Sequence, residues 1–387
     1  MKKFICNYPW THFEVNNPNG DVTMCCDNST VLGNVNQGSI EEIWNGPGFQ
    51  EMRRRMRDQG AHALCPRSCP VLHGLKNYQK LEWHADLPAG SVSKGNAELN
   101  DIELAAGKTK LESKPRWMRY AYSYKCNLDC YHCYQREDAL LNDTLPDSFM
   151  KQVYDLAPYY QVMLFFGGEP FLYKPVLKMM EEIEVEPDCK FFMITNGTLL
   201  TDRMFENLET RNIGLFAVSL DAASAGLFDT LRVRGRTASW DTLMANLSRI
   251  AELHKRKGFQ FQISMTVNSM NCHQIEDFVD LGLSVDAEPL LLLVSNPDGT
   301  SAFQRQYLHF TAAQLAEIAG QIEQSLVKVR ARNMPEAEAG LVRLESMLRE
   351  HRRRANSIVV FNLRRVARTV FYRLPTPVQY RIRHYLS

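Results

Sequence analysis

The sequence has no long hydrophobic run and no secretory signal. Its opening residues, MKKFICNYPW, have no apolar stretch after the two lysines. The longest apolar block, LLLLV at 290–294, is far shorter than the roughly 18 residues that a membrane helix needs. We therefore expect a cytoplasmic protein, in which cysteines stay reduced. Ten cysteines in 387 residues then favour metal binding over a disulfide scaffold.

Acidic residues and lysine are missing from the last part of the chain. Residues 351–387 contain nine arginines and no Asp, Glu or Lys, although the net charge of the whole chain is only +1. A helix over 357–373 would be basic and amphipathic. Such helices lie on anionic membrane surfaces, contact nucleic acid or dock onto an acidic partner, including the chain's own acidic body. These alternatives stay open, but nothing here resembles an added RNA-binding module.

Short apolar segments alternate with amphipathic ones from about 117 to 297. The expected strands are 119–124, 162–167, 190–196, 214–221, 261–268 and 289–295, and the expected helices are 147–157, 174–186, 201–211, 239–257 and 272–282. Repeated βαβ units predict a parallel sheet. Strands this apolar are covered on both faces, as in a barrel or a doubly wound sheet. After 310 the pattern becomes helical, with Thr311 as an expected N-cap.

Three cysteines follow the first of these strands, in the segment CNLDCYHCY. Cys126, Cys130 and Cys133 are spaced so that one loop can wrap a metal cluster, and thiolates are ligands for soft metals. The carboxyl ends of parallel strands are also where α/β folds build active sites. On spacing alone, a zinc knuckle that borrows a distant fourth ligand is the alternative.

The sequence downstream of the loop distinguishes between these readings. Cys-x3-Cys-x2-Cys with an aromatic residue before the last cysteine resembles the signature loop of the radical SAM superfamily. GGEP at 167–170, ITNGT, VSLDA, FDTLRVRGR and MTVN then follow in the order of that family, each near an expected strand end. The resemblance implies an α/β fold with a partial (β/α)6 TIM-like barrel. It also implies a [4Fe–4S] cluster on the three cysteines, with S-adenosylmethionine on the fourth iron.

The same resemblance assigns further residues to the cofactor site. They are His132, Gly167, Gly168, Glu169, Pro170, Asn196, Ser219, Asp221 and Arg234. Their chemistry is suitable, because glycines allow close backbone approach and a carboxylate accepts hydrogen bonds from an amine. Several also have ordinary structural explanations, since Asn-Gly is a common turn and Ser or Asp often caps a helix. No catalytic residue can be named.

A second group of cysteines lies near the N-terminus. Cys6, Cys25, Cys26, Cys65 and Cys69 occur with the phrases GDVTMCC, LGNVNQGSIEEIWNG and CPRSC. This order resembles SPASM/twitch modules, which hold auxiliary iron–sulfur clusters. Such modules normally follow the radical SAM domain, whereas this one precedes it. Five cysteines suffice for one four-thiolate cluster: we expect Cys6, Cys65, Cys69 and one of the adjacent pair, with Cys25 preferred. A structural zinc site is the alternative.

Local signals complete the reading of this segment. Asn19-Gly20 predicts a hairpin turn. Ser39 and Glu42 predict a capping box for a helix through EEIW and on into EMRRRMRD. Cys189 and Cys272 are expected to be ordinary core or surface thiols. Residues 86–115, rich in Gly, Ser, Lys and Glu, are expected to form a linker or a loosely packed connection.

The expected organisation is thus a SPASM/twitch-like module (1–80), a linker (81–115), a radical SAM core (116–300) and a helical extension with an Arg-rich tail (301–387). The resemblance implies hydrogen abstraction from a peptide or a small polar metabolite, with oxidation or bond formation as the outcome. It further implies an electron donor such as a flavodoxin or ferredoxin. The alternative is a non-catalytic iron–sulfur or zinc scaffold that keeps the fold.

Overall fold

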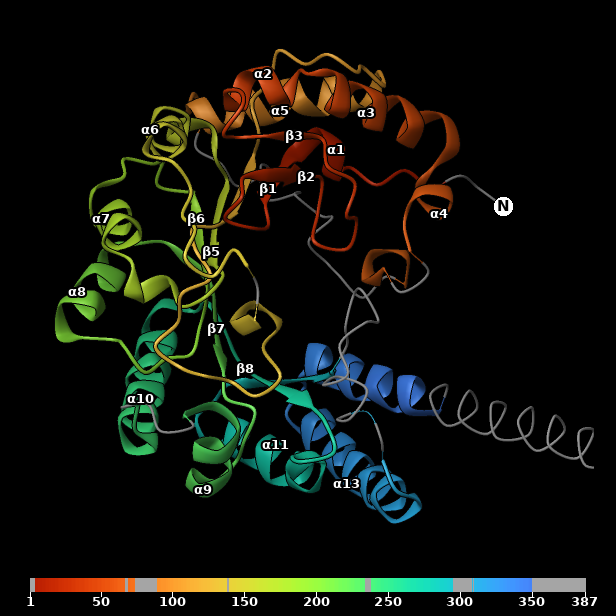
Figure 1. Cartoon of the computed structure of the whole chain (residues 1–387), viewed down its shortest axis with the longest axis vertical. Helices are drawn as coiled ribbons and strands as arrows, with labels where there is room; N and C mark the ends of the chain where they lie inside the picture. Colours follow the sequence, from red (N-terminus) through yellow and green to blue (C-terminus); the bar gives the residue numbers. More distant parts are fainter. Residues whose placement is uncertain are drawn as a thin grey trace, which may run out of the picture.

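The computed structural model describes residues 4–66, 69–73, 89–137, 139–233, 238–294, 308 and 310–349. The expected helix at 357–373 and the candidate residue Arg234 lie outside this part of the chain. One nine-stranded sheet, in the order β3-β2-β1-β4-β5-β6-β7-β8-β9, organises the molecule (Figure 1). Among the described residues, no helix is long and apolar enough to cross a membrane.

The strands are β1 (His12–Val15), β2 (Asp21–Thr23), β3 (Gly33–Asn34), β4 (Trp117–Ala121), β5 (Val162–Phe166), β6 (Lys190–Thr195), β7 (Ile213–Ser219), β8 (Gln260–Val267) and β9 (Glu288–Leu293). The α-helices are α1 (Tyr8–Thr11), α2 (Ile40–Trp44), α3 (Pro47–Gln59), α4 (Ala61–Leu64), α5 (Val92–Ala105), α6 (Asp147–Asp155), α7 (Lys174–Glu182), α8 (Asp202–Thr210), α9 (Ala225–Phe228), α10 (Trp240–Lys257), α11 (Ile275–Ser284) and α13 (Ala312–Ala331). A π-helix, η7, covers Asp229–Val233.

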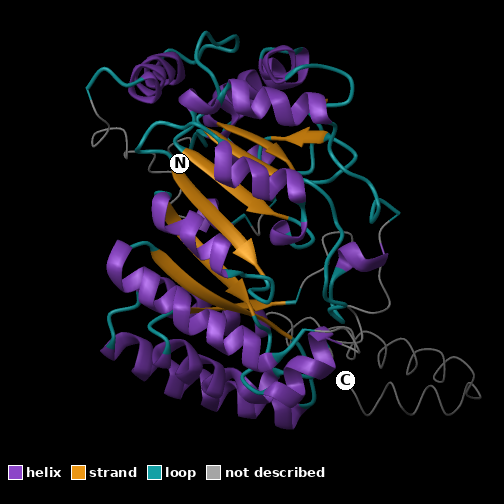
Figure 2. Ribbon diagram, turned by 90° about the vertical axis from the view of Figure 1, so that its left-hand side faces the viewer, coloured by secondary structure: helices purple, strands orange, loops and turns teal. Residues whose placement is uncertain are grey.

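The predicted parallel sheet is confirmed. Strands β4 to β9 pair in chain order and every pair is parallel. Each strand end lies within three residues of its predicted position. Helices α6, α7, α8, α10 and α11 connect these strands and lie along the outer side of the sheet (Figures 1 and 2). The carboxyl ends of the strands therefore meet at one edge, as the α/β partial-barrel fold requires.

The N-terminal segment extends this sheet. Strand β1 pairs in parallel with β4, so that His12 lies opposite Trp117 and Glu14 opposite Arg119. Strands β1 and β2 form the predicted hairpin, and Gly20 adopts the positive φ of 87° that its turn requires. The division between residues 1–80 and 116–300 remains a prediction, but one sheet runs through both.

The predicted helix start at Ser39 is confirmed, whereas the predicted length of that helix is wrong. The Ser39 and Glu42 capping box is present at the start of α2. The helix ends at Trp44, and a new helix, α3, begins at Pro47. Proline has no N–H to continue the ladder of hydrogen bonds, but it fits well at a first helical position, so Gly46-Pro47 separates two helices.

The expectation of a loosely packed connection over 86–115 is wrong for its described part. Residues Val92–Ala105 form α5, whose buried side chains include polar ones. Asn100 donates to the Trp10 carbonyl at 2.7 Å, and Glu103 accepts from the Ser113 hydroxyl at 2.6 Å. Because α5 uses polar side chains for packing, its sequence lacks the apolar periodicity that would have predicted a buried helix.

The C-terminal helices close the other end of the sheet (Figure 1). Thr311 caps α13 as predicted, together with Gln314. Ile318, Ile322 and Val329 are buried on the inner side of α13. Residues 335–349 form a further helical segment.

Candidate functional site

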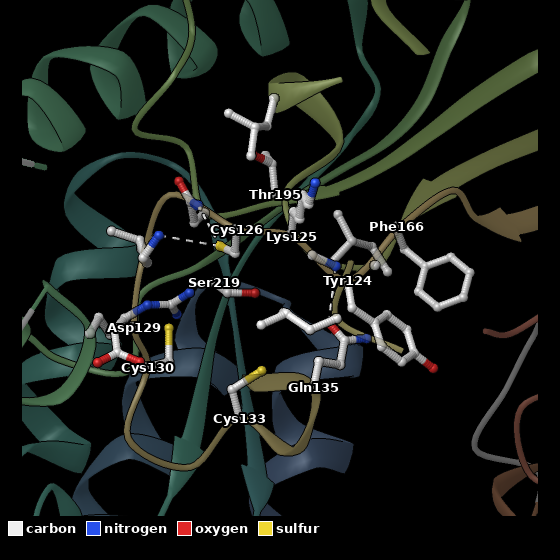
Figure 3. A pocket seen from close by; sticks show the side chains of 18 of the residues that line it. Tyr124, Lys125, Cys126, Asp129, Cys130, Cys133, Gln135, Phe166, Thr195 and Ser219 are labelled. Carbon is white, nitrogen blue, oxygen red and sulfur yellow. Dashed lines mark hydrogen bonds between the residues drawn. The ribbon is translucent and has the colours of Figure 1, made fainter. Parts of the chain in front are cut away.

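A cavity of about 500 Å³ opens at the carboxyl ends of the central parallel strands (Figure 3). Seven of the predicted site residues line it: Cys126, Cys130, Cys133, Gly167, Gly168, Asn196 and Ser219. Thr195 of the ITNGT motif also lines it, as do side chains that the sequence did not point to, among them Tyr124, Gln135, Phe166 and Arg232. The predicted strand-end residues thus come together from β4, β5, β6 and β7 in one place.

The three cysteines reach the cavity on a loop that is fixed through its backbone. The Asp129 N–H donates to the Arg232 carbonyl at 3.0 Å, and the Tyr131 N–H donates to the Leu231 carbonyl at 2.7 Å. Both carbonyls belong to the π-helix η7. Such helices are rare, usually form a single turn and are frequent at functional sites. In Figure 3 the sulfur atoms of Cys126, Cys130 and Cys133 face a common space.

The environment of these thiols is buried and partly positive. Burial raises the pKa of Cys126 to about 11 and that of Cys130 to about 12, while the nearby Arg232 charge acts in the opposite direction. The Leu128 N–H and the Asn196 amide approach the Cys126 sulfur at 3.4 and 3.7 Å. Thiolates here therefore need a positive partner, which a bound metal supplies.

No three ligand side chains gather around a single ion position anywhere in the described residues. In an iron–sulfur cluster each thiolate binds a different iron, so the thiols need only surround a larger volume.

The Gly167-Gly168 turn brings backbone to the cavity wall. Their φ angles are +85° and +53°, which glycine adopts without strain. A Cβ at Gly167 would lie 2.5 Å from the Ala121 Cβ, and one at Gly168 would overlap the Lys125 carbonyl and the Tyr173 hydroxyl. Both positions therefore require glycine.

The loop after Cys133 returns to this turn through Gln135. The Gly168 N–H donates to the Gln135 side-chain oxygen at 2.9 Å. No sequence pattern pointed to Gln135, because its role depends on the path of the loop rather than on a motif.

Glu169 and Pro170 do not line the cavity. The Glu169 carboxylate is fully buried and accepts hydrogen bonds from the Thr195 hydroxyl and the Asn196 N–H, both at 2.7 Å. Burial raises the pKa of Glu169, and these donors oppose that shift. Glu169 therefore holds the end of β6, whose Thr195 and Asn196 do line the cavity. The expected contact between Glu169 and a ligand amine stays a prediction.

Asp221 is likewise buried behind the cavity. Its carboxylate lies 2.6 Å from Arg232 Nη1 and 3.3 Å from His132 Nε2, and it accepts the Thr266 N–H at 2.6 Å. Although burial alone would raise it, the pKa of Asp221 is held below its usual range by His132 and Arg232. His132 therefore packs behind the cysteine loop and is not part of the cavity wall.

Arg232 is a cavity residue that the sequence interpretation did not name. Within LRVRGR the sequence offers several arginines, and Arg234 was chosen. The structure brings Arg232 into the cavity wall beside the cysteines. Arg234 lies outside the described residues, so its assignment to the cofactor site stays a prediction.

The N-terminal cysteines lie in the segments before β1, after β2 and after α4. Cys6, Cys25 and Cys69 are buried, Cys65 is half-buried and Cys26 is exposed. Burial and the adjacent Cys69 raise the pKa of Cys65 to about 11. The turn after Cys26 is tied to the segment of Cys65, because the Asn28 amide donates to the Leu64 carbonyl at 3.1 Å. Cys189 and Cys272 are buried in the core, one of the two situations expected for them.

Comparisons with known proteins agree with this geometry. Residues 120–282 match the model of the radical SAM superfamily, and residues 6–70 match that of the SPASM iron–sulfur cluster-binding domain. An AdoMet-dependent heme synthase from Methanosarcina barkeri is 25% identical over 46% of this chain and 50% of its own. A PqqA peptide cyclase from Bradyrhizobium diazoefficiens is 21% identical over 54% of each chain.

The crystal structure of Streptococcus suis SuiB bound to precursor peptide SuiA aligns over 60% of this chain and 51% of its own, with a TM-score of 0.44 and 18% identity. The chain spans about half the length of the curated relatives named above. The two matched segments cover both cysteine groups, and the cavity contains the three cysteines of the loop. The chain belongs to the radical SAM superfamily and carries a SPASM iron–sulfur cluster-binding domain in front of its radical SAM core.

Proposed function

We propose that this chain is a radical SAM enzyme that modifies a peptide. One observation carries the proposal: Cys126, Cys130 and Cys133 line the same cavity as the Gly167-Gly168 turn and the ends of β6 and β7. A non-catalytic scaffold needs the three cysteines but has no use for a ligand cavity beside them.

The donor set fits a [4Fe–4S] cluster with an open iron. Burial raises the pKa of Cys126 and Cys130, so a cationic partner would favour their thiolates. Three thiolates leave one iron of a cubane without a protein ligand. The Gly167-Gly168 turn brings backbone into the wall of the same cavity. When bound, the cluster and S-adenosylmethionine together supply a 5′-deoxyadenosyl radical, which abstracts hydrogen from the substrate.

The protein's own residues would bind S-adenosylmethionine and orient it. Gly167 and Gly168 offer backbone atoms to S-adenosylmethionine, and Asn196 and Ser219 offer polar side chains from the neighbouring strands. Arg232, held by Asp221, places a fixed positive charge beside the cysteines. Phe166 and Leu172 form apolar parts of the wall and limit access of water. The cofactor carries the difficult chemistry, and these groups position it.

The SPASM segment supplies a second cluster site. Cys6, Cys65 and Cys69 with one of Cys25 and Cys26 would hold it, and such a cluster would accept the electron that the substrate radical loses when it is oxidised. A peptide substrate is supported by the relative named as a PqqA peptide cyclase. A low-potential donor such as a flavodoxin or ferredoxin would reduce the cluster in the cavity.

The test is direct. The full chain is reconstituted anaerobically with iron and sulfide, reduced with dithionite and incubated with S-adenosylmethionine, and 5′-deoxyadenosine is measured by liquid chromatography. We expect formation of 5′-deoxyadenosine that requires Cys130. A fully loaded protein that produces none would favour the scaffold instead. Peptide modification is then sought by mass spectrometry with peptides encoded beside this gene.

A further inference from the structure

Tyr124 lines one wall of the cavity, and the N-terminal hairpin holds its side chain in place. In Figure 3 it lies with Phe166 on the side of the cavity opposite Cys126 and Cys130. The Tyr124 hydroxyl donates to the Asn16 carbonyl at 3.1 Å, and Asn16 directly follows β1. Its amide donates to the Thr23 hydroxyl of β2 at 2.7 Å, so the turn that receives Tyr124 is itself fixed.

Phe166 is held through two charged residues. The guanidinium carbon of Arg119 lies 4.0 Å from the centroid of the Phe166 ring, within the range of a cation–π contact. Arg119 Nη1 lies 3.0 Å from Glu14 Oε2. The Glu14 side chain is only 4% exposed and that of Arg119 only 15% exposed. The pair thus joins β1 of the SPASM segment to a wall of the cavity.

Within the described part of the barrel, no carboxylate pairs with Arg119 in place of Glu14. Across the sheet, Arg119 has Glu14 as its partner on β1 and Leu164 as its partner on β5. Its Nε atom has no hydrogen-bond partner within the described part of the chain. A guanidinium in this position, removed from water, needs a carboxylate to fix its direction. Among the described residues, strand β1 places one, Glu14, directly opposite, and Cys26 of the same SPASM segment also interacts with Arg119.

We propose that Glu14 is a positioning residue for the S-adenosylmethionine cavity, acting through Arg119 on Phe166, so that ligand binding in the radical SAM core depends on strand β1 of the SPASM segment. The inference rests on the proposed function, because it takes S-adenosylmethionine as the ligand of the cavity. Glu14 itself does not line the cavity. It fixes the direction of the Phe166 ring, which lines the cavity.

The experiment compares Glu14→Gln with the unchanged full-length chain, both reconstituted with iron and sulfide. S-adenosylmethionine affinity is measured by equilibrium dialysis, and iron content is measured on the same samples. We expect Glu14→Gln to bind about tenfold more weakly, within the usual range for coupled sites, at equal iron content. Glu14→Asp, which keeps the charge, should recover part of the affinity. Glu41→Gln is the matched control, because Glu41 lies in the same segment but is exposed and pairs with Lys114.

A second variant covers the case in which Glu14→Gln does not fold. Tyr124→Phe removes only the hydroxyl that donates to Asn16, and we expect it to weaken S-adenosylmethionine binding by about threefold, as the loss of one modest hydrogen bond would. Unchanged affinity in a folded Glu14→Gln protein would overturn the inference while leaving the proposed function intact. Absence of binding by the unchanged, iron-loaded chain would overturn both. If Glu41→Gln weakened S-adenosylmethionine binding as well, the effect would belong to the SPASM segment in general. That result would overturn the specific role of Glu14.

Discussion

The guanidinium of Arg232 lies 2.6 Å from the carboxylate of Asp221, and both groups are buried behind the cysteine loop. The pair connects the end of β7 to the π-helix η7, whose carbonyls hold the loop. This buried ion pair therefore links the sheet to the backbone that carries Cys130, together with the contact between His132 and Asp221.

Asp221→Asn should destabilise the protein strongly. It keeps the size of the side chain but leaves the Arg232 charge without its partner, at a cost of about 3–5 kcal/mol in the free energy of unfolding. Urea unfolding followed by circular dichroism measures this. Arg203→Gln serves as the control, because Arg203 is 76% exposed in its pair with Glu181 and should matter by less than about 1 kcal/mol. Equal effects of the two variants would contradict the role given to Asp221.

The contribution of Asp221 should depend on pH. Its pKa is lower in the folded protein than in the unfolded chain, so the folded state binds fewer protons at this site. The stabilisation is therefore complete above the unfolded value of about 3.9 and is lost as the pH falls below it. Urea unfolding at pH 7 and near pH 3 should give a difference between the unchanged chain and Asp221→Asn that shrinks at the lower pH. A constant difference would argue against this titration.

Gly168→Ala should abolish S-adenosylmethionine binding. The added Cβ would overlap the Lys125 carbonyl and the Tyr173 hydroxyl, and the φ of +53° is strained for alanine. Equilibrium dialysis reports the loss. Gly320→Ala in α13 is the matched control, since a Cβ there meets nothing within 4 Å. Alanine at that helical position should stabilise the protein by about 0.5–1 kcal/mol.

The two cysteine groups should lose iron separately. Replacing Cys126, Cys130 and Cys133 by alanine should leave about four irons per chain, those of one cubane in the SPASM segment. Cys65→Ala with Cys69→Ala should instead remove the SPASM iron and keep the cluster of the cavity. Cys189→Ala, at a buried thiol outside both groups, is the control and should keep full iron content. Bound zinc in place of iron would refute the cluster assignment.

Local signals predicted most of the barrel. Apolar strands, helix caps such as Ser39 and Thr311, and the glycines of GGEP act over a few residues, and each was found where expected. The prediction that Cys126, Cys130 and Cys133 come together with strand-end residues needed only the rule that parallel strands end at one edge.

The remaining features depend on distant contacts. The place of Arg232 in the cavity wall depends on how η7 packs against the cysteine loop. The buried donors to Glu169 come from the next strand, which the GGEP motif does not reveal. Helix α5 was missed because its buried face is polar. None of these is visible as periodicity or spacing in a short window of sequence.

The parallel pairing of β1 with β4 also has a consequence for how the chain folds. Glu14 and Arg119 are partners although 105 residues separate them in the sequence. The edge of β1 that pairs with β4 therefore stays uncovered until β4 has been synthesised. Closing such a long loop is slow compared with local pairing. A fragment that stopped between the two matched segments would leave β1 with an open edge, ready to pair with other chains and aggregate. The SPASM segment and the radical SAM core share one sheet, so expressing either of them alone would leave part of that sheet without its partner strands. The two segments should be soluble only when they are produced together.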